Sequence, residues 1–288
     1  MTNGAAVFGR AIACLAALLA ARAHAEDIDT EHIFGFMIGA DVGTKGEREF
    51  QSQTSAALGK SGGRYRAVGQ ELELEVVPAD NFRIEVGAAV AAHDIRGVPG
   101  LDDRRQLTLQ GGSIDLRYKF LDRHAAPFGV TAAIQSFADR VDETTGEKVN
   151  SRGAELTLAL DRDLIPDVVV GGINLIYQPE WTRTIDTDVA ERQSTAGTAV
   201  GVMAQVYPGV LLGGEARYLR RYDVLGLDRL AGQALFIGPT AYIQLSTLSR
   251  LTVSWSSQAW RHEAGSNSAL DLTNFERHQA RVVFGINF

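Results

Sequence analysis

Charged side chains occupy every second position in several stretches of this sequence, opposite apolar ones. In the clearest stretch, Glu71, Glu73 and Glu75 alternate with two leucines and a valine. Successive side chains of a strand point to opposite sides, so this spacing predicts a β-strand with one charged face. The candidate residues that share such a position are Glu71, Glu73, Glu75, Arg83, Glu85, Asp115, Arg117, Lys119, Glu155, Asp161, Glu215, Arg217 and Arg281.

Two kinds of chemistry are open to these charges. Rows of carboxylates facing rows of guanidinium groups create a transverse field, which selects and orients a polar solute. The same groups can instead pair with one another and stiffen a closed protein. The first alternative predicts a selective channel, and the second predicts a structural protein.

Catalytic and metal-binding patterns are weak. The histidines outside the N-terminal stretch show no H-x-H or i, i+4 spacing, and the only cysteine is Cys14. No arrangement brings a histidine and a serine together as base and nucleophile, although His93, His262 and Ser256-Ser257 were considered for that role. We predict no metal site and no cofactor, and an enzyme only as an alternative.

Strand-like alternation extends along the whole chain, whereas helical periodicity is scarce. We predict about twelve strands, nine of them with approximate bounds 31–41, 65–77, 82–93, 168–181, 195–207, 210–222, 232–245, 251–262 and 276–288, and three whose clearest alternation lies at 114–120, 128–134 and 154–161. The connections alternate between long polar ones, such as 42–64 and 140–150, and tight ones that mostly contain proline. Short turns at one end and long loops at the other are typical of transmembrane β-barrels.

Composition narrows the class further. The mean hydropathy is −0.05, and no long apolar run follows the N-terminal stretch, which excludes a helical membrane protein. Barrel strands alternate and average to such mild values, although a secreted soluble β domain does so too. The net charge is −7 without any basic block, so nucleic acid is not an expected partner.

Both ends of the chain carry recognisable signals. Arg10, the apolar run 11–21 and the A-x-A site at 23–25 predict a signal peptide over 1–25 that is cleaved after Ala25. The remaining 26–288 would form a single barrel. At the C-terminus, apolar side chains alternate up to a final aromatic: Val282, Phe284, Ile286 and Phe288.

This terminal pattern resembles the last strand of Gram-negative outer-membrane β-barrel proteins, the porin-like type included. The resemblance implies an all-β, antiparallel, up-and-down transmembrane barrel in contact with outer-membrane lipid and lipopolysaccharide. It also implies that the barrel-assembly machinery reads the terminal strand during insertion. Both termini would lie on the periplasmic side and the long loops outside the cell, with strand 31–41 pairing to the closing strand.

The membrane setting decides which face points inward. An arginine or lysine facing mid-bilayer lipid costs about 2–4 kcal/mol, so the charged faces should line the lumen. We therefore predict a passive channel or transporter for small polar or amphipathic solutes, with the first and sixth long loops narrowing its mouth. The alternatives are a closed structural or adhesion barrel and an outer-membrane lipid hydrolase, although the His-x-Ser-Asn-Gly pattern of the phospholipase family is absent.

Overall fold

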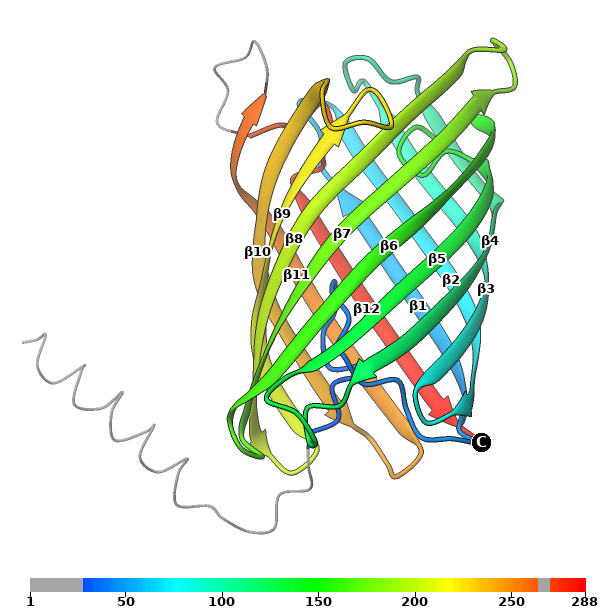
Figure 1. Ribbon diagram of the computed structural model, residues 1–288. Coiled ribbons are helices and arrows are strands. Elements are labelled where there is room, and N and C mark those ends of the chain that lie inside the picture. Colours follow the sequence, from blue (N-terminus) through cyan, green and yellow to red (C-terminus); the bar gives the residue numbers. More distant parts are fainter. Residues whose placement is uncertain (1–27, 264–269) are drawn as a thin grey trace, which may run out of the picture.

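Twelve antiparallel strands form a closed barrel in the computed structural model, which describes residues 28–263 and 270–288 (Figure 1). The predicted signal peptide lies outside these residues. The strands are β1 (Arg48–Leu58), β2 (Arg64–Ala79), β3 (Phe82–Arg96), β4 (Arg104–Leu121), β5 (Gly129–Val141), β6 (Lys148–Ile165), β7 (Val169–Thr184), β8 (Ala190–Tyr207), β9 (Val210–Tyr222), β10 (Leu230–Gln244), β11 (Ser249–Glu263) and β12 (His278–Asn287). Each strand pairs with its sequence neighbours, and β12 pairs with β1. The predicted all-β, up-and-down fold is confirmed.

The barrel wall carries its apolar side chains outside and its charges inside. On β2, Leu72 and Leu74 are each 49% exposed, whereas Glu73 is 6% exposed and Glu75 is fully buried. On β3, Val86 is 52% exposed and Arg83 only 1%. Water around such a protein would reverse this distribution, while lipid favours it. Among the described residues, no helix is long and apolar enough to cross a membrane.

The two ends of the barrel differ. One end, at the bottom of Figure 1, carries the turns after the even-numbered strands and the C-terminus, and we call it the short-turn end. The opposite, long-loop end carries the connections after the odd-numbered strands. The predicted difference in length is only partly correct, because the strands continue beyond their predicted bounds. The connection 122–128 at the short-turn end is as long as 97–103 at the other end.

The predicted first strand is wrong. Residues 31–41 form no strand, and β1 lies instead within the predicted polar loop 42–64. The outward face of β1 carries Phe50, Ser52, Thr54, Ala56 and Leu58, so large apolar side chains mark it only toward its two ends. Its partners are those of a first strand nonetheless, since β1 pairs with β12 on one side and β2 on the other.

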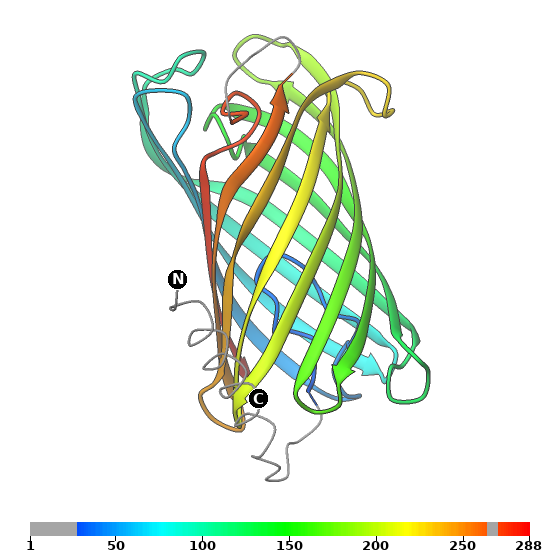
Figure 2. The ribbon, with the colours of Figure 1, turned by 90° about the vertical axis from the view of Figure 1, so that its left-hand side faces the viewer.

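The segment 28–47 enters the barrel from the short-turn end, and we call it the plug segment (Figures 1 and 2). Its apolar side chains pack inside the barrel rather than against lipid. Ile33, Phe34 and Met37 form a buried cluster with wall residues such as Val170 and Met203. The alternation over 31–41 therefore does not mark a strand, and burial in the segment does not follow it, since Ile33 and Met37 are buried while Phe36 and Ile38 are half-buried.

Candidate functional site

Side chains of the barrel wall bind the backbone of the plug segment. The Glu215 carboxylate on β9 accepts hydrogen bonds from the amides of Gly35 (2.7 Å) and Phe36 (2.9 Å). Asn174 on β7 both accepts from the Ile38 amide and donates to the Ile38 carbonyl, each at 2.8 Å. A segment without secondary structure must satisfy its buried amides and carbonyls elsewhere. Here the polar lumen supplies the partners.

A second set of contacts holds the part of the plug segment nearest to the short-turn end. Asp161 on β6 accepts from the Ala40 amide (2.8 Å) and from the Thr30 hydroxyl. Arg123, in the turn 122–128, donates to Thr30 (2.9 Å) and Asp41 (2.5 Å). Because the guanidinium is buried between these groups, the turn and the plug segment are fixed to each other.

Glycines let the plug segment approach the wall and itself. A Cβ atom on Gly35 would lie 1.6 Å from the Ser254 hydroxyl oxygen, and one on Gly39 would lie 2.0 Å from the Thr30 carbonyl oxygen. Both distances are far below van der Waals contact, so a side chain at either position would displace the segment. These two glycines explain how the sequence FGFMIGA fits the lumen.

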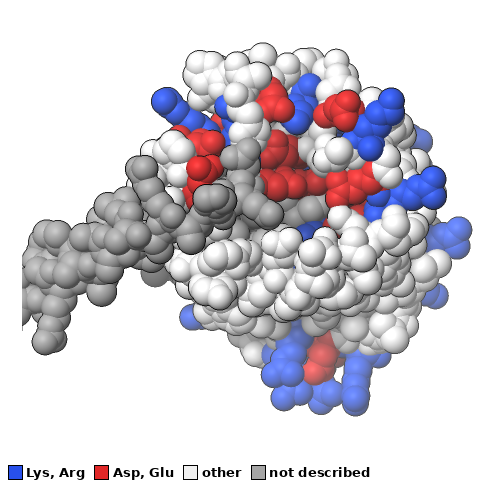
Figure 3. All heavy atoms as spheres, turned by 90° about the horizontal axis from the view of Figure 1, so that it is seen from below, with Lys and Arg blue, Asp and Glu red and all other residues white. Residues whose placement is uncertain are grey.

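An ion-pair cluster joins the plug segment to the wall. Arg83 on β3 contacts the carboxylates of Glu31 (3.0 Å), Glu75 (3.1 Å) and Glu85 (2.5 Å). His32 lies beside it, and acidic side chains gather at the centre of this end of the barrel (Figure 3). Burial, with the nearby Glu75 charge, holds the pKa of Glu31 well above its ordinary value. Burial, with Arg250 and Arg83, holds the pKa of His32 well below its ordinary value, so its imidazole is neutral.

A polar cavity of about 550 Å³ extends from the plug segment to the loops of the long-loop end. Acidic side chains line the arc from β2 to β7, among them Glu71, Asp139 and Glu180. Basic side chains line the opposite arc from β9 to β12: Arg250, which pairs with Glu49, and the three arginines Arg217, Arg221 and Arg281. In the part of the chain that the structure describes, these three arginines form no ion pair. The cavity therefore has an acidic and a basic side.

The structure divides the predicted lumen residues into groups. The residues that bind the plug segment or belong to its ion-pair cluster are Glu75, Arg83, Glu85, Asp161 and Glu215. The residues that line the cavity are Glu71, Glu73, Arg83, Glu85, Asp115, Arg117, Glu155, Arg217 and Arg281. Lys119 instead contacts Asp122 (3.1 Å) and Asp41 (4.0 Å) near the short-turn end. Their role in selectivity stays a prediction.

Two of the arginines serve the cavity and the plug segment together. The Arg217 guanidinium lies 4.1 Å from the ring centre of Phe36, and Arg281 donates to the Gly35 carbonyl (3.1 Å). Sequence reasoning missed Asn174, which carries no charge to mark it. It also missed Glu49 and Arg250, which form an ion pair but lay in a predicted loop and a predicted turn.

One catalytic prediction is wrong. The Ser257 hydroxyl and His278 Nδ1 lie 2.9 Å apart, because these residues are direct partners on β11 and β12. Trp255, which is 40% exposed, donates to the same hydroxyl (3.0 Å) and lies beside the imidazole, so the pair is on the outer face. No acid or amide among the described residues hydrogen-bonds the other imidazole nitrogen. Local spacing could not predict this pair, because its members are 21 residues apart and meet only through strand pairing.

The four residues of the predicted insertion signal share the outer face of β12 and its end. Val282, Phe284, Ile286 and Phe288 are 40%, 37%, 39% and 68% exposed. This placement suits contact with lipid. Recognition by the assembly machinery stays a prediction.

Comparisons with known proteins define the fold. A family model described as a family of unknown function (DUF6662) matches residues 26–288. The chain is similar to the COG4313 outer membrane channel from Pseudomonas putida F1, with a TM-score of 0.60 and 11% identity over 91% of this chain and 100% of that chain. It is also similar to the NanC porin, with a TM-score of 0.52 and 8% identity over 83% and 100% of the two chains. No curated protein matches the sequence. The fold is that of a Gram-negative outer-membrane β-barrel.

Proposed function

Since the chain belongs to this family of unknown function, we propose its function from its own structure. The protein is an outer-membrane channel that admits small polar solutes at its long-loop end and is narrowed at its short-turn end by the plug segment. The long-loop end faces the outside of the cell, and both termini face the periplasm. The described fold, shared with an outer membrane channel and a porin, supports the membrane setting.

The two-sided polar cavity carries this proposal. A volume of about 550 Å³ lies within the range of small-molecule sites, which is roughly 300–1,000 Å³. A barrel that only needed stiffness would pair its lumen charges, as Arg83 and its three carboxylates do. Arg217, Arg221 and Arg281 instead leave their charge facing the cavity, opposite the acidic arc. The field between the arcs favours dipolar solutes, which align with it.

Ion selectivity in planar bilayers tests the channel. In a salt gradient, Glu71→Gln should shift the reversal potential toward anion preference, because it removes a negative charge from the acidic arc. Arg221→Gln should shift it the opposite way, since Arg221 lies on the basic arc and, among the described residues, donates only to Gln193 and to a backbone carbonyl. The exposed Asp186→Asn, in the loop 185–189 and outside the cavity lining, is the matched control and should change nothing.

Reversal potentials that stay unchanged in both variants would show that the cavity is not on a conducting path. A protein that inserts but passes no ions, with or without the plug segment, would be the closed structural barrel. Because the two neutral variants should shift the reversal potential in opposite directions, a general effect of substitution on the barrel would not produce both results.

The Ser257–His278 contact favours a second candidate, an outer-membrane lipid hydrolase. The serine hydroxyl is within reach of a base, and the pair lies on the lipid-facing wall beside Trp255. Two features of the described residues weigh against it. No third group orients the imidazole, and the amides of the paired strands are engaged in the sheet and cannot stabilise an oxyanion.

Phospholipid vesicles test this candidate. The purified protein should release no fatty acid from them above the rate of Ser257→Ala, which removes the hydroxyl and leaves the barrel intact. A release that Ser257→Ala and His278→Gln both abolish would establish the hydrolase and displace the channel as the main function. Release that survives both variants would come from a contaminant.

A further inference from the structure

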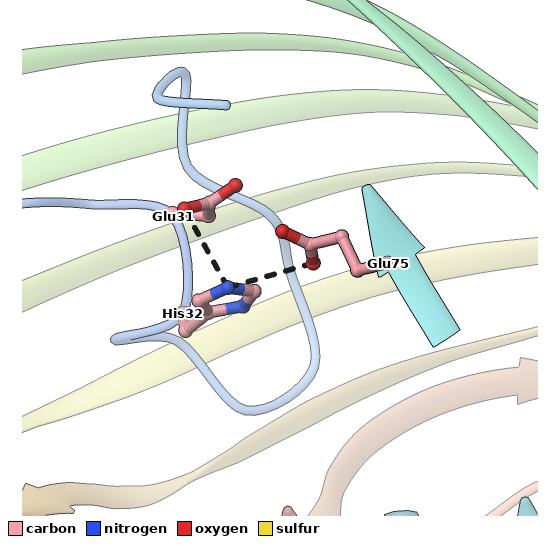
Figure 4. Close-up of side chains that lie close together, drawn as sticks. All are labelled: Glu31, His32 and Glu75. Atoms are coloured by element: carbon pink, nitrogen blue, oxygen red, sulfur yellow. Dashed lines mark ion pairs between the residues drawn. The ribbon is translucent and has the colours of Figure 1, made fainter. Parts of the chain in front are cut away.

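Three potential metal ligands meet where the plug segment touches β2. His32 Nε2 lies 3.6 Å from Glu31 Oε2 and 3.7 Å from Glu75 Oε2, and all three atoms lie within 4.8 Å of one another. Glu31 and His32 come from the plug segment and Glu75 from the wall, and the three side chains point toward one another (Figure 4). Ligand atoms around a tetrahedral zinc ion at 2.0–2.2 Å are about 3.3–3.5 Å apart. The two distances from His32 are within a few tenths of an ångström of this spacing, and the carboxylates of Glu31 and Glu75, which lie within 4.8 Å of each other, would close by up to about 1.3 Å around an ion.

A second observation, independent of this spacing, points to a cation. Glu75 is fully buried, yet its Oε1 accepts no hydrogen bond within the described chain. An unpaired buried carboxylate oxygen is costly unless something charged or protic contacts it. The neighbouring Arg83 and Gln51 bind only the other oxygen of this carboxylate, at 3.1 Å each.

The charge balance of the cluster also favours a bound cation. The carboxylates of Glu31, Glu49, Glu75 and Glu85 meet the guanidinium groups of Arg83 and Arg250. Four carboxyl groups therefore share two guanidinium groups, and a bound cation would take the place of the proton that the raised pKa of Glu31 favours. The Glu49 carboxylate also lies 3.7 Å from His32 Nε2 and completes the acidic surroundings.

We propose that Glu31, His32 and Glu75 bind one divalent transition-metal ion of the zinc type, which fastens the plug segment to β2. An imidazole together with carboxylates suits zinc, cobalt or nickel, whereas calcium and magnesium take oxygen ligands alone. The neutral imidazole of His32 is the form that binds metal. Arg83 and Gln51 orient the two carboxylates from outside the ligand set. This site does not depend on the channel function.

Titration of the full-length protein in detergent with ZnCl₂ tests the site. We expect one saturable equivalent, and a weakening of at least about 100-fold in His32→Gln and in Glu75→Gln, because even residues behind a ligand contribute 10–100-fold. His93→Gln and Glu155→Gln are matched controls, since they remove an imidazole and a carboxylate from the lumen wall elsewhere and should bind as the unchanged protein does. MgCl₂ at the same concentration should not compete.

Zinc-edge X-ray absorption of the unchanged protein removes any dependence on how the variants fold. It should show one imidazole and two or more oxygen ligands at about 2.0–2.2 Å. The proposal is overturned if the protein binds no saturable zinc. It is equally overturned if His32→Gln and Glu75→Gln leave the affinity unchanged, or if the spectrum shows several imidazoles.

Discussion

Deletion of residues 28–42 should raise the single-channel conductance severalfold in planar bilayers. This part of the plug segment occupies the lumen through Glu215, Asn174 and Asp161, so its loss opens the short-turn end. The deletion spares residues 43–47, whose backbone pairs with Val77 at the start of β1. All twelve strands remain, and the lumen side chains that lose their partners can be hydrated. The barrel is therefore expected to fold.

A reversible cross-link gives the matched control. A Cβ atom on Gly129 would lie 2.9 Å from the Cβ atom of Ala40, so a separation of about 1 Å brings a cysteine pair to disulfide spacing, near 3.8 Å. Ala40→Cys with Gly129→Cys should conduct less when oxidised than when reduced, because the bond holds the plug segment against β5. The only other cysteine is Cys14, in the predicted signal peptide.

Equal conductance in the deleted, oxidised and unchanged proteins would show that the plug segment does not obstruct the path. Each single cysteine variant should be insensitive to reductant. Any response in those variants would come from a disulfide between two protein molecules rather than from the designed bond. The cross-link would then be uninformative, and the deletion alone would test whether the plug segment obstructs the path.

Arg83→Leu should destabilise the folded protein by about 3–5 kcal/mol, the usual cost of removing one partner from a buried ion-pair group. Arg83 is 1% exposed and contacts three carboxylates, which would then lie buried without their cation. Arg83→Lys should recover only part of the loss, since an ammonium group cannot reach the three carboxylates as a guanidinium fork does. Urea unfolding in lipid vesicles measures both.

Arg64→Leu is the matched control. Arg64 also pairs with a carboxylate, that of Asp94 at 3.3 Å, but its side chain is 54% exposed. An exposed pair contributes about 0–1 kcal/mol, so the control should change stability little. Similar losses in Arg83→Leu and Arg64→Leu would mean that the cluster around Arg83 is hydrated in the membrane, contrary to its burial.

The fold could be predicted from the sequence because lipid on one side and water on the other require the strands to alternate apolar and polar side chains. The alternation of Leu72 and Leu74 with Glu73 and Glu75 fixes both the strand and its two faces. The same rule failed twice near the start of the chain, at β1 and at the plug segment before it. β1 shows mostly small or polar side chains to lipid, while residues 31–41 alternate as a strand would but pack inside the barrel.

The site was less accessible because its parts meet only in the folded chain. Local spacing cannot reveal that the plug segment brings His32 to Glu75, or that strand pairing brings Ser257 to His278. Interior charges such as Glu215 and Asp161 were assigned to the lumen, and the structure places them there. What a charge pattern cannot show is that their partners are backbone amides of the chain's own N-terminal part.

The arrangement of the plug segment also determines how it responds to force. Its backbone is held at separate points in sequence, by Asp161 at Ala40, by Asn174 at Ile38 and by Glu215 at Gly35. A pulling force from the short-turn end would break these hydrogen bonds one after another rather than all at once. Sequential rupture needs a weaker pull than the simultaneous rupture of the same contacts.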